Sequence, residues 1–223
     1  MQNEPTKRVL VVSMTYNRKD TTEQWLKELH IKAGYPFKHV VVDNGSTDGT
    51  REWLLESKMN FSLLPNEENV GIMKAWIQAY QYSIDNGFFP DYILKYDDDC
   101  EIKTPNILEK MVAFMEKTDD RYCIAPIDLN IDPEYVPQRL IEFKDVEKIE
   151  GETVRVVTHI GGMFALYPVK AFQKFLEVGG VERDQRRGEF LREQHRINSL
   201  YLCDLWVAHQ GGGKSPNIDD YKF

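Results

Sequence analysis

The sequence has few cysteines, and this shortage excludes two classes of protein. Cys100, Cys123 and Cys203 are the only three cysteines among the 223 residues. An odd, widely spaced set does not form a disulfide framework, and the absence of a Cys-x-x-Cys pair argues against a zinc site. We therefore expect reduced thiols and a cytoplasmic protein.

Long apolar runs and an excess of basic charge are also missing. No apolar stretch approaches the roughly 20 residues of a membrane-spanning helix, and the N-terminus does not resemble a signal peptide. We expect a soluble protein whose membrane contact is at most peripheral. The formal net charge is −8, from 28 basic and 36 acidic residues. Such a balance argues against affinity for nucleic-acid phosphates and favours acids clustered around a cation.

Several catalytic motifs are absent as well. The sequence contains no Gly-x-Ser-x-Gly and no His-Glu-x-x-His motif, which leaves a serine hydrolase or a zinc protease unsupported. Gly213-Lys214-Ser215 resembles the end of a phosphate-binding loop, but that pattern requires glycine where Ala208 stands. A flexible lid over a ligand remains a possible role for this segment.

The first 127 residues alternate between short apolar runs and segments with helical periodicity. Predicted strands lie at residues 8–14, 39–42, 61–64, 92–95 and 122–127, and predicted helices at about 20–32, from 50, 69–86 and 104–117. We expect Asp20 and Glu23 to form a capping box at the first helix. The alternation predicts an α/β fold with a mainly parallel twisted sheet and helices on both faces.

The second half of the chain has a different pattern. Two strands around a turn are predicted at residues 139–148 and 154–158, a further strand at 161–167, a charged helix at 183–196 and a last strand at 202–207. We expect a single domain over residues 1–223. Its first half is 7–127, its second half with a small β subregion is 128–210, and its flexible tail is 211–223.

Polar clusters follow three of the predicted strands, at residues 15–18, 43–48 and 97–99. Ligands bind at the carboxyl ends of the strands in sheets of this kind. Asp97, Asp98 and Asp99 repel one another, so a nearby cation is expected to stabilise them. If the strand continues, Asp97 and Asp99 point to one side, and two oxygen ligands suit Mg²⁺ or Mn²⁺. The alternative is a solvated acidic turn.

Four further features have two interpretations each. Asp43 is either a ribose ligand or part of an Asx-turn. Gly71, at the predicted start of a helix, and Lys74 bind phosphate, or they belong to an ordinary cap with a solvated lysine. His209 is structural or a metal ligand. Residues 183–196 are a salt-bridged surface helix or carry a general base.

Taken together, the motifs resemble the family 2 glycosyltransferases of the GT-A fold. The matching segments are VVSMTYNR, VVVDNGSTDGT, NEENVGIMKA, YILKYDDDCEI, GGMFALY and LWVAHQ. The resemblance covers roughly residues 7–210 and is strongest over 7–110. It implies a transferase that uses a nucleotide-diphosphate-sugar donor and a divalent cation.

The resemblance also implies roles for individual residues. Donor-binding positions would be Thr15, Tyr16, Asn17, Arg18, Asp43, Asn44, Gly71, Lys74, Asp97 and Asp98. The metal ligands would be Asp99, Asp97 and His209. Bound there, the metal would stabilise the departing nucleoside diphosphate as a Lewis acid.

Members of the family invert the anomeric centre and take the general base from an acidic Glu-Asp pair. No such pair occurs in the corresponding region of this sequence, where Glu189 is the best candidate and Asp184 the second. The family's processive Gln-x-x-Arg-Trp motif is also absent, so one sugar per encounter is expected. A non-catalytic module that binds a nucleotide-sugar or a glycan is the main alternative.

A sugar-phosphate nucleotidyltransferase is less favoured, because the loop after the first strand lacks glycine. A glycoside hydrolase would leave the three aspartates unexplained. The sequence leaves open the donor sugar and base, the oligomeric state and the acceptor, which could be a glycan, a lipid, a protein or a modified nucleic acid.

Overall fold

The computed structural model describes residues 7–128, 146–180 and 184–210. Its strands form one 10-stranded sheet. They are β1 (Val9–Thr15), β2 (Lys38–Asp43), β3 (Ser62–Pro65), β4 (Tyr92–Tyr96), β5 (Cys100–Ile102), β6 (Tyr122–Asp128), β7 (Val146–Ile149), β8 (Glu152–Val157), β9 (Phe164–Pro168) and β10 (Asn198–His209). The helices are α1 (Lys19–Lys32), α2 (Thr50–Glu56), α3 (Ile72–Asp85), α4 (Ile107–Lys117), α6 (Val169–Glu177) and α7 (Asp184–His195).

The strand order is β3-β2-β1-β4-β9-β6-β10-β8-β7, with β5 paired to β10. Strands β1 to β4 are parallel to one another, and β6 is parallel to β10. Strand β9 lies antiparallel between β4 and β6. We call the edge where β1, β2 and β4 end the carboxyl edge, and the edge where β6 and β10 begin the amino edge. The predicted α/β fold with a mostly parallel sheet is confirmed.

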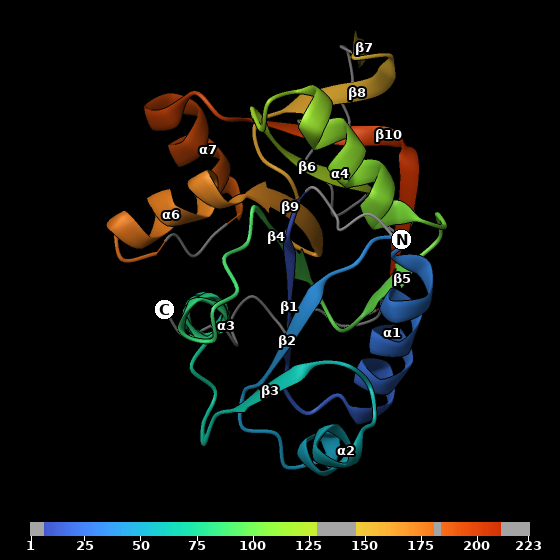
Figure 1. Ribbon diagram of the computed structural model, residues 1–223, viewed down its shortest axis with the longest axis vertical. Helices are drawn as coiled ribbons and strands as arrows, with labels where there is room; N and C mark the ends of the chain where they lie inside the picture. Colours follow the sequence, from blue (N-terminus) through green and yellow to red (C-terminus); the bar gives the residue numbers. More distant parts are fainter. Residues whose placement is uncertain (1–6, 129–145, 181–183, 211–223) are drawn as a thin grey trace.

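Helices cover both faces of this sheet, as expected from the alternation in sequence. One hydrophobic cluster packs side chains of α1, α2 and α4 against the sheet, including Trp25, Leu54 and Met111. A second cluster packs α3, α6 and α7 against the opposite face, including Trp76 and Phe172. Figure 1 shows the two groups of helices on either side of the sheet. The core therefore consists of two layers that hold the strand ends in fixed positions.

The reversed strand β9 also fixes the position of α6. Tyr92, the first residue of β4, pairs with Pro168, the last residue of β9. The chain thus returns to the amino edge, and α6 begins there at Val169. Proline is favoured at a helix start because its fixed φ suits the turn and it needs no hydrogen-bond donor.

Three local expectations differ from the structure. The capping box is wrong, because α1 begins at Lys19 with Arg18 as its N-cap, so Asp20 lies inside the helix. Helix α4 begins at Ile107, after Asn106 with φ +55°, rather than at residue 104. Strand β5 was not predicted, since its three residues are too short for a periodic pattern.

Parts of two further expectations lie outside the described residues. The strand expected at residues 139–148 is described from Val146 on, and the expected flexible tail at 211–223 is not described. Among the described residues, no helix has the length and apolar character needed to cross a membrane.

Candidate functional site

The candidate site lies at the carboxyl edge, where the loops after β1, β2 and β4 meet. Thr15 at the end of β1 pairs with Asp43 at the end of β2. The backbone N–H of Asn44 donates to the carbonyl oxygen of Thr15 at 2.9 Å. Strand β1 also pairs with β4. The polar clusters after these strands therefore adjoin, as the parallel topology requires.

Arg18 joins the loop after β1 to the turn after β4. Its Nη1 lies 2.5 Å from Oδ2 of Asp99 and 3.3 Å from Oδ1 of Asp98. The side chain of Arg18 is 43% exposed, whereas those of Asp98 and Asp99 are 5% and 7% exposed. Hydrogen bonds between two charged groups are stronger than neutral ones. Arg18 therefore supplies a counter-charge to two carboxylates that have little contact with water.

Burial and the neighbouring charges shift the pKa values of this cluster. Desolvation raises the pKa of Asp98 to about 6, and the other two aspartates add to the rise while Arg18 opposes it. Thr22 on α1 also donates from Oγ1 to Oδ2 of Asp98 at 3.0 Å. Burial lowers the pKa of Arg18, but Asp98 and Asp99 together raise it above its ordinary value. The site thus concentrates negative charge that a cation stabilises.

The expected alternation of the three aspartates is wrong. Strand β4 ends at Tyr96, and Asp98 and Asp99 lie in a turn, so the side-chain period of a strand does not apply to them. Arg18 contacts both Asp98 and Asp99, while Asp97 forms an ion pair with Lys95. Asp97 therefore has a different ion-pair partner from the other two aspartates.

Asp43 has an extensive set of contacts within the protein. It is fully buried, and its Oδ1 accepts a 3.0 Å hydrogen bond from the backbone N–H of Ser46. Its Oδ2 accepts a 2.6 Å bond from Nε of Arg51. Arg51 also donates to the carbonyl oxygen of Asn66, and Asn66 donates to Oδ1 of Asn44 at 3.0 Å. The bond from Ser46 spans three residues rather than the two of an Asx-turn, and ribose binding by Asp43 stays a prediction.

The loop after β1 is locked to the loop after β2 through Asn17. This residue has φ +52°, a left-handed conformation that asparagine tolerates better than most residues. Its backbone N–H donates to Oγ of Ser46 at 3.0 Å, and its Oδ1 accepts from the backbone N–H of Thr47 at 2.7 Å. Tyr16 is 47% exposed, and Thr15 bonds to Thr22 at 2.7 Å.

A cavity of about 350 Å³ adjoins this loop. It is lined by Asn17, Arg18, Lys19, Asp20, Thr21 and Asp48. Two of the predicted donor-binding residues, Asn17 and Arg18, thus border an open space.

The start of α3 differs slightly from the predicted cap. The helix begins at Ile72, with Gly71 as N-cap at φ +81°, a conformation that glycine adopts without strain. Oδ1 of Asn69 accepts a 2.9 Å hydrogen bond from the N–H of Gly71, so Asn69 stabilises the turn before the helix. Lys74 is exposed. Phosphate binding by Gly71 and Lys74 stays a prediction.

The end of β10 lies beside the aspartate turn. His209 pairs with Cys100 in the antiparallel pair of β10 and β5, and the N–H of Gln210 donates to the carbonyl oxygen of Asp99 at 2.7 Å. The backbone of His209 is therefore close to the turn, although its side chain lies outside the described residues. Residues far apart in sequence meet here because β5 folds back onto β10.

The two candidate bases lie on α7. Glu189 is half-buried. Burial lowers the pKa of His159, and the negative charge of Glu189 opposes this with a smaller rise. Gly188 precedes Glu189 on the same helix, and a Cβ atom there would lie 2.3 Å from the carbonyl oxygen of Thr158. The absence of a side chain at Gly188 therefore permits α7 to pack closely against Thr158. Asp184 begins α7, and its side chain lies outside the described residues.

The donor chemistry of the turn fits a hard divalent cation. Among the described side chains, no group of three or more His, Cys, Asp or Glu residues is arranged to hold a metal ion. Mg²⁺ and similar ions need only one or two protein carboxylates, because substrate phosphates and water complete the coordination. Asp98 and Asp99 are 4% and 5% exposed, and such crowded carboxylates favour a cation.

Three contributors to the site were not predicted from the sequence. Lys95 is 3% exposed and donates to the carbonyl oxygen of Gly162 at 2.7 Å as well as to Asp97. A lysine within an apolar strand is a usable signal, since buried lysines are almost always paired. Arg51 and Thr22 carry no such signal, because their partners are set by tertiary packing.

The family model for Glycosyl transferase family 2 matches residues 10–176, well over half of the chain. The chain belongs to glycosyl transferase family 2. Membership confirms the resemblance drawn from the motifs and supports a glycosyl transfer function. No curated protein matches the chain.

Solved structures of other proteins share the fold. The mannosyltransferase PcManGT of Pyrobaculum calidifontis, in complex with GDP-Man and Mn²⁺, has a TM-score of 0.69 and 19% identity over 94% of this chain and 58% of its own. TarS 1–349 of S. aureus, in complex with UDP-GlcNAc, has a TM-score of 0.64 and 18% identity over 93% and 61%. This family 2 chain thus has the GT-A fold and spans about three fifths of their length.

Proposed function

We propose that the chain transfers a sugar from a nucleotide-diphosphate-sugar to an acceptor hydroxyl or amine, with inversion and with the help of a divalent cation. Family membership supports the transfer of a sugar. The observation that carries the finer proposal is the buried carboxylate pair, Asp98 and Asp99, held by Arg18 at the carboxyl edge. A site of this charge suits a cation together with a diphosphate.

The donor would bind across the three loops of the carboxyl edge. Asn17 and Arg18 border the open cavity, and Asp43 with Asn44 lies at the end of the neighbouring strand. Gly71 precedes α3, whose first N–H groups and positive dipole end favour a phosphate. These residues would orient the nucleotide without taking part in bond breaking.

Asp99, Asp97 and His209 would hold the metal. When bound, the cation supplies Lewis-acid stabilisation of the negative charge that develops on the diphosphate. Asp98 would contact the ribose or the water around the metal. Arg18 would keep the carboxylates of the turn in place, because it contacts both Asp98 and Asp99.

Inversion requires a single displacement at the anomeric carbon. The acceptor oxygen or nitrogen forms a bond to that carbon as the bond to the diphosphate breaks, and the acceptor's proton passes to a carboxylate. Glu189 is the first candidate for this base and Asp184 the second. Both lie on α7, and Asp184 is five residues, or about 8 Å, nearer the start of the helix.

The test is a thermal-shift screen of UDP-, GDP-, dTDP- and CMP-sugars, each with Mn²⁺ and with chelator. Ligand binding to the folded state raises the melting temperature by mass action. GDP-Man and UDP-GlcNAc, the ligands of the similar structures, come first. A shift with one nucleotide class that disappears on chelation supports the proposal, and no shift with any donor contradicts it.

A non-catalytic donor-binding module is the second candidate. The sequence lacks the family's Glu-Asp pair, and the candidate Glu189 lies beside His159. Release of nucleoside diphosphate from the bound donor distinguishes the two functions. Slow release by water as the acceptor supports an enzyme, whereas binding without any release over many hours supports the module.

A further inference from the structure

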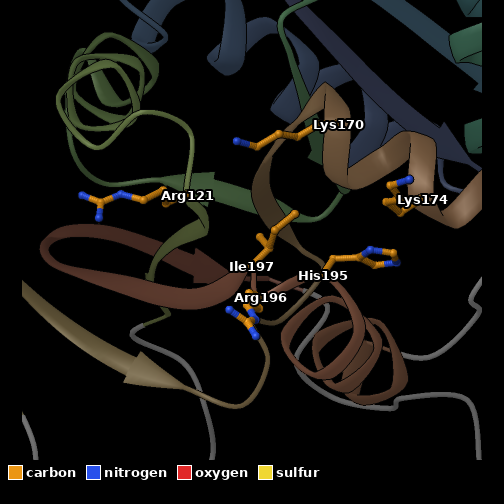
Figure 2. Close-up of a pocket in the computed structure, with 6 residues that line it drawn as sticks. All are labelled: Arg121, Lys170, Lys174, His195, Arg196 and Ile197. Atoms are coloured by element: carbon orange, nitrogen blue, oxygen red, sulfur yellow. The ribbon is translucent and has the colours of Figure 1, made fainter.

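A basic pocket lies at the amino edge of the sheet, opposite the candidate donor site. Its volume is about 330 Å³, and it is lined by Arg121, Lys170, Lys174, His195, Arg196 and Ile197. Figure 2 shows the two lysines on α6, Arg121 before β6, His195 at the end of α7, and Arg196 and Ile197 between α7 and β10. Strand β6 has seven residues, so about 20 Å separates this pocket from the carboxyl edge.

The pocket concentrates positive charge in a protein of net charge −8. Five of the residues that line the pocket have basic side chains. Among the described residues, one ion pair involves any of them, between Lys174 and Glu177 at 2.6 Å. Nearby carboxylates are engaged by other cations. Asp120 pairs with Lys7 at 3.5 Å, and Asp91 with Arg8 at 3.6 Å. In the part of the chain that the structure describes, one ion pair therefore offsets the mutual repulsion of these cations.

Arg196 is placed there at a cost in backbone energy. Its φ is +56°, and the N–H of Ile197 donates to the carbonyl oxygen of Leu191 at 3.0 Å. Arg196 directly follows His195, the last residue of α7, a position where glycine commonly adopts the left-handed conformation. A side chain in this conformation is strained, and such strain is concentrated at functional sites.

Lys170 is also placed unfavourably. It lies in the first turn of α6, where the helix dipole disfavours a cation and favours an anion. Lys174 follows four residues later, and like charges at this spacing destabilise a helix. Both penalties disappear when an anion lies between the lysines and the start of the helix.

Arg121 contributes a guanidinium that two contacts hold in place. Its Nε donates to the carbonyl oxygen of Thr118 at 2.9 Å, which fixes the side chain at the end of α4. The guanidinium also lies over the ring of Tyr122, with 5.8 Å from its central carbon to the ring centroid. A guanidinium held in this way presents its terminal N–H groups as a fork that matches phosphate oxygens.

We propose that this pocket binds a phosphate-bearing anion with two or more negative charges, as a second site separate from the donor site. A volume of about 330 Å³ is at the lower end of the range for small-molecule sites and exceeds the need of a single phosphate. The phosphate is carried either by a soluble metabolite or by an anionic lipid headgroup.

The first test measures pyrophosphate binding to the full chain by calorimetry, with chelator present and at constant ionic strength. Pyrophosphate also resembles part of the donor, so the measurement is repeated with Asp99→Asn and with Arg18→Gln, which alter the donor site. Binding that persists in both variants and weakens about tenfold in Lys170→Glu supports the proposal. Lys110→Glu, the same change at an exposed position of α4, is the control and should bind normally.

The variant Arg196→Gly tests whether Arg196 serves ligand binding or only the structure of the turn. Glycine relieves the positive φ, so the melting temperature should rise by roughly 2–4 °C, while pyrophosphate affinity should fall by about tenfold. Unchanged affinity in both Arg196→Gly and Lys170→Glu would overturn the proposal, as would the absence of binding to the wild-type chain at millimolar pyrophosphate.

The second test distinguishes the two sources of phosphate. Flotation compares vesicles of phosphatidylcholine alone with vesicles that also contain phosphatidic acid, whose phosphate monoester can carry two negative charges. Binding to the anionic vesicles that is lost in Lys170→Glu assigns the site to a headgroup. Pyrophosphate binding without vesicle binding assigns it to a soluble phosphate compound. Failure of both arms refutes the site, and leaves the donor-dependent thermal shift of the proposed transferase unaffected.

Discussion

Arg18, in the loop after β1, and Asp99, in the turn after β4, form an ion pair with 2.5 Å between Nη1 of the arginine and Oδ2 of the aspartate. The same nitrogen lies 3.3 Å from Asp98. The arginine is partly in water while the carboxylates are not. The electrostatics of the site thus depend on one cation that precedes α1.

Replacement of Arg18 by glutamine should lower the free energy of unfolding by about 1–2 kcal/mol. Removing one partner of a buried pair costs more than this, but the 43% exposure of the arginine side chain reduces the loss. Urea unfolding at pH 7.5 measures the effect. A double-mutant cycle with Asp99→Asn should show coupling of the two changes.

Lys27→Gln provides the matched control on the same helix. Lys27 pairs with Glu23 at 2.6 Å, but both side chains are more exposed than the aspartates, at 53% and 35%. A surface pair of this kind contributes about 0.5 kcal/mol or less. An equal loss in Arg18→Gln and Lys27→Gln would show that the buried carboxylates do not depend on Arg18.

Asp99→Asn should abolish the metal-dependent part of donor binding and leave the fold intact. The change preserves the shape of the side chain and removes a charge that has little solvation, 5% exposed, so circular dichroism should be unchanged. Thermal shift with donor and Mn²⁺ is the measurement. Asp85→Asn, at an exposed position of α3, should respond like the wild type, and a full donor shift in Asp99→Asn would remove this residue from the metal site.

Much of the architecture was predictable, because its signals are local. Apolar runs that alternate with helical periodicity identified the parallel sheet, and the loops that follow the strands identified the carboxyl edge. The turn at Asp98 and Asp99 was placed correctly after β4. What failed there was the orientation, because the strand ends at Tyr96 and the side-chain period ends with it.

The remaining features depend on contacts between distant residues. Strand β9 lies between β4 and β6 although it follows both in sequence, and no local pattern encodes that insertion. The links from Arg51 to Asp43 and from Lys95 to Gly162 are likewise set by packing. The basic pocket escaped prediction for the same reason, since Arg121, Lys170 and Arg196 come from three separate segments.

Buried His39 should make the protein less stable as the pH falls below 6.5. Burial, with a smaller contribution from the charge of His30, lowers the pKa of His39 from 6.5 to about 3. Its neutral form accordingly stabilises the fold fully above pH 6.5, and this contribution is lost as the pH falls toward 3. For one proton, the free energy of unfolding then falls by up to about 1.4 kcal/mol per pH unit.

Urea unfolding between pH 7.5 and 5 measures this slope, and His39→Gln should flatten it. His39 bonds to Ser13 and to His30, both at 3.0 Å, so the variant loses absolute stability as well. NMR of the wild type gives an independent readout, in which the ring signals of His39 do not titrate above pH 5. A His39 ring that titrates near pH 6.5 would refute the prediction.

The general base gives the last prediction, because two residues compete for the role. Glu189→Gln should slow release of nucleoside diphosphate by about 10²–10⁴-fold, the usual contribution of a positioned base, with donor affinity unchanged. Asp184→Asn should then have a small effect. Glu193→Gln, an exposed residue of the same helix, is the control. Normal turnover in Glu189→Gln with slow turnover in Asp184→Asn would assign the proton transfer to Asp184 at the start of α7. Full activity in both variants would exclude the helix as the source of the base.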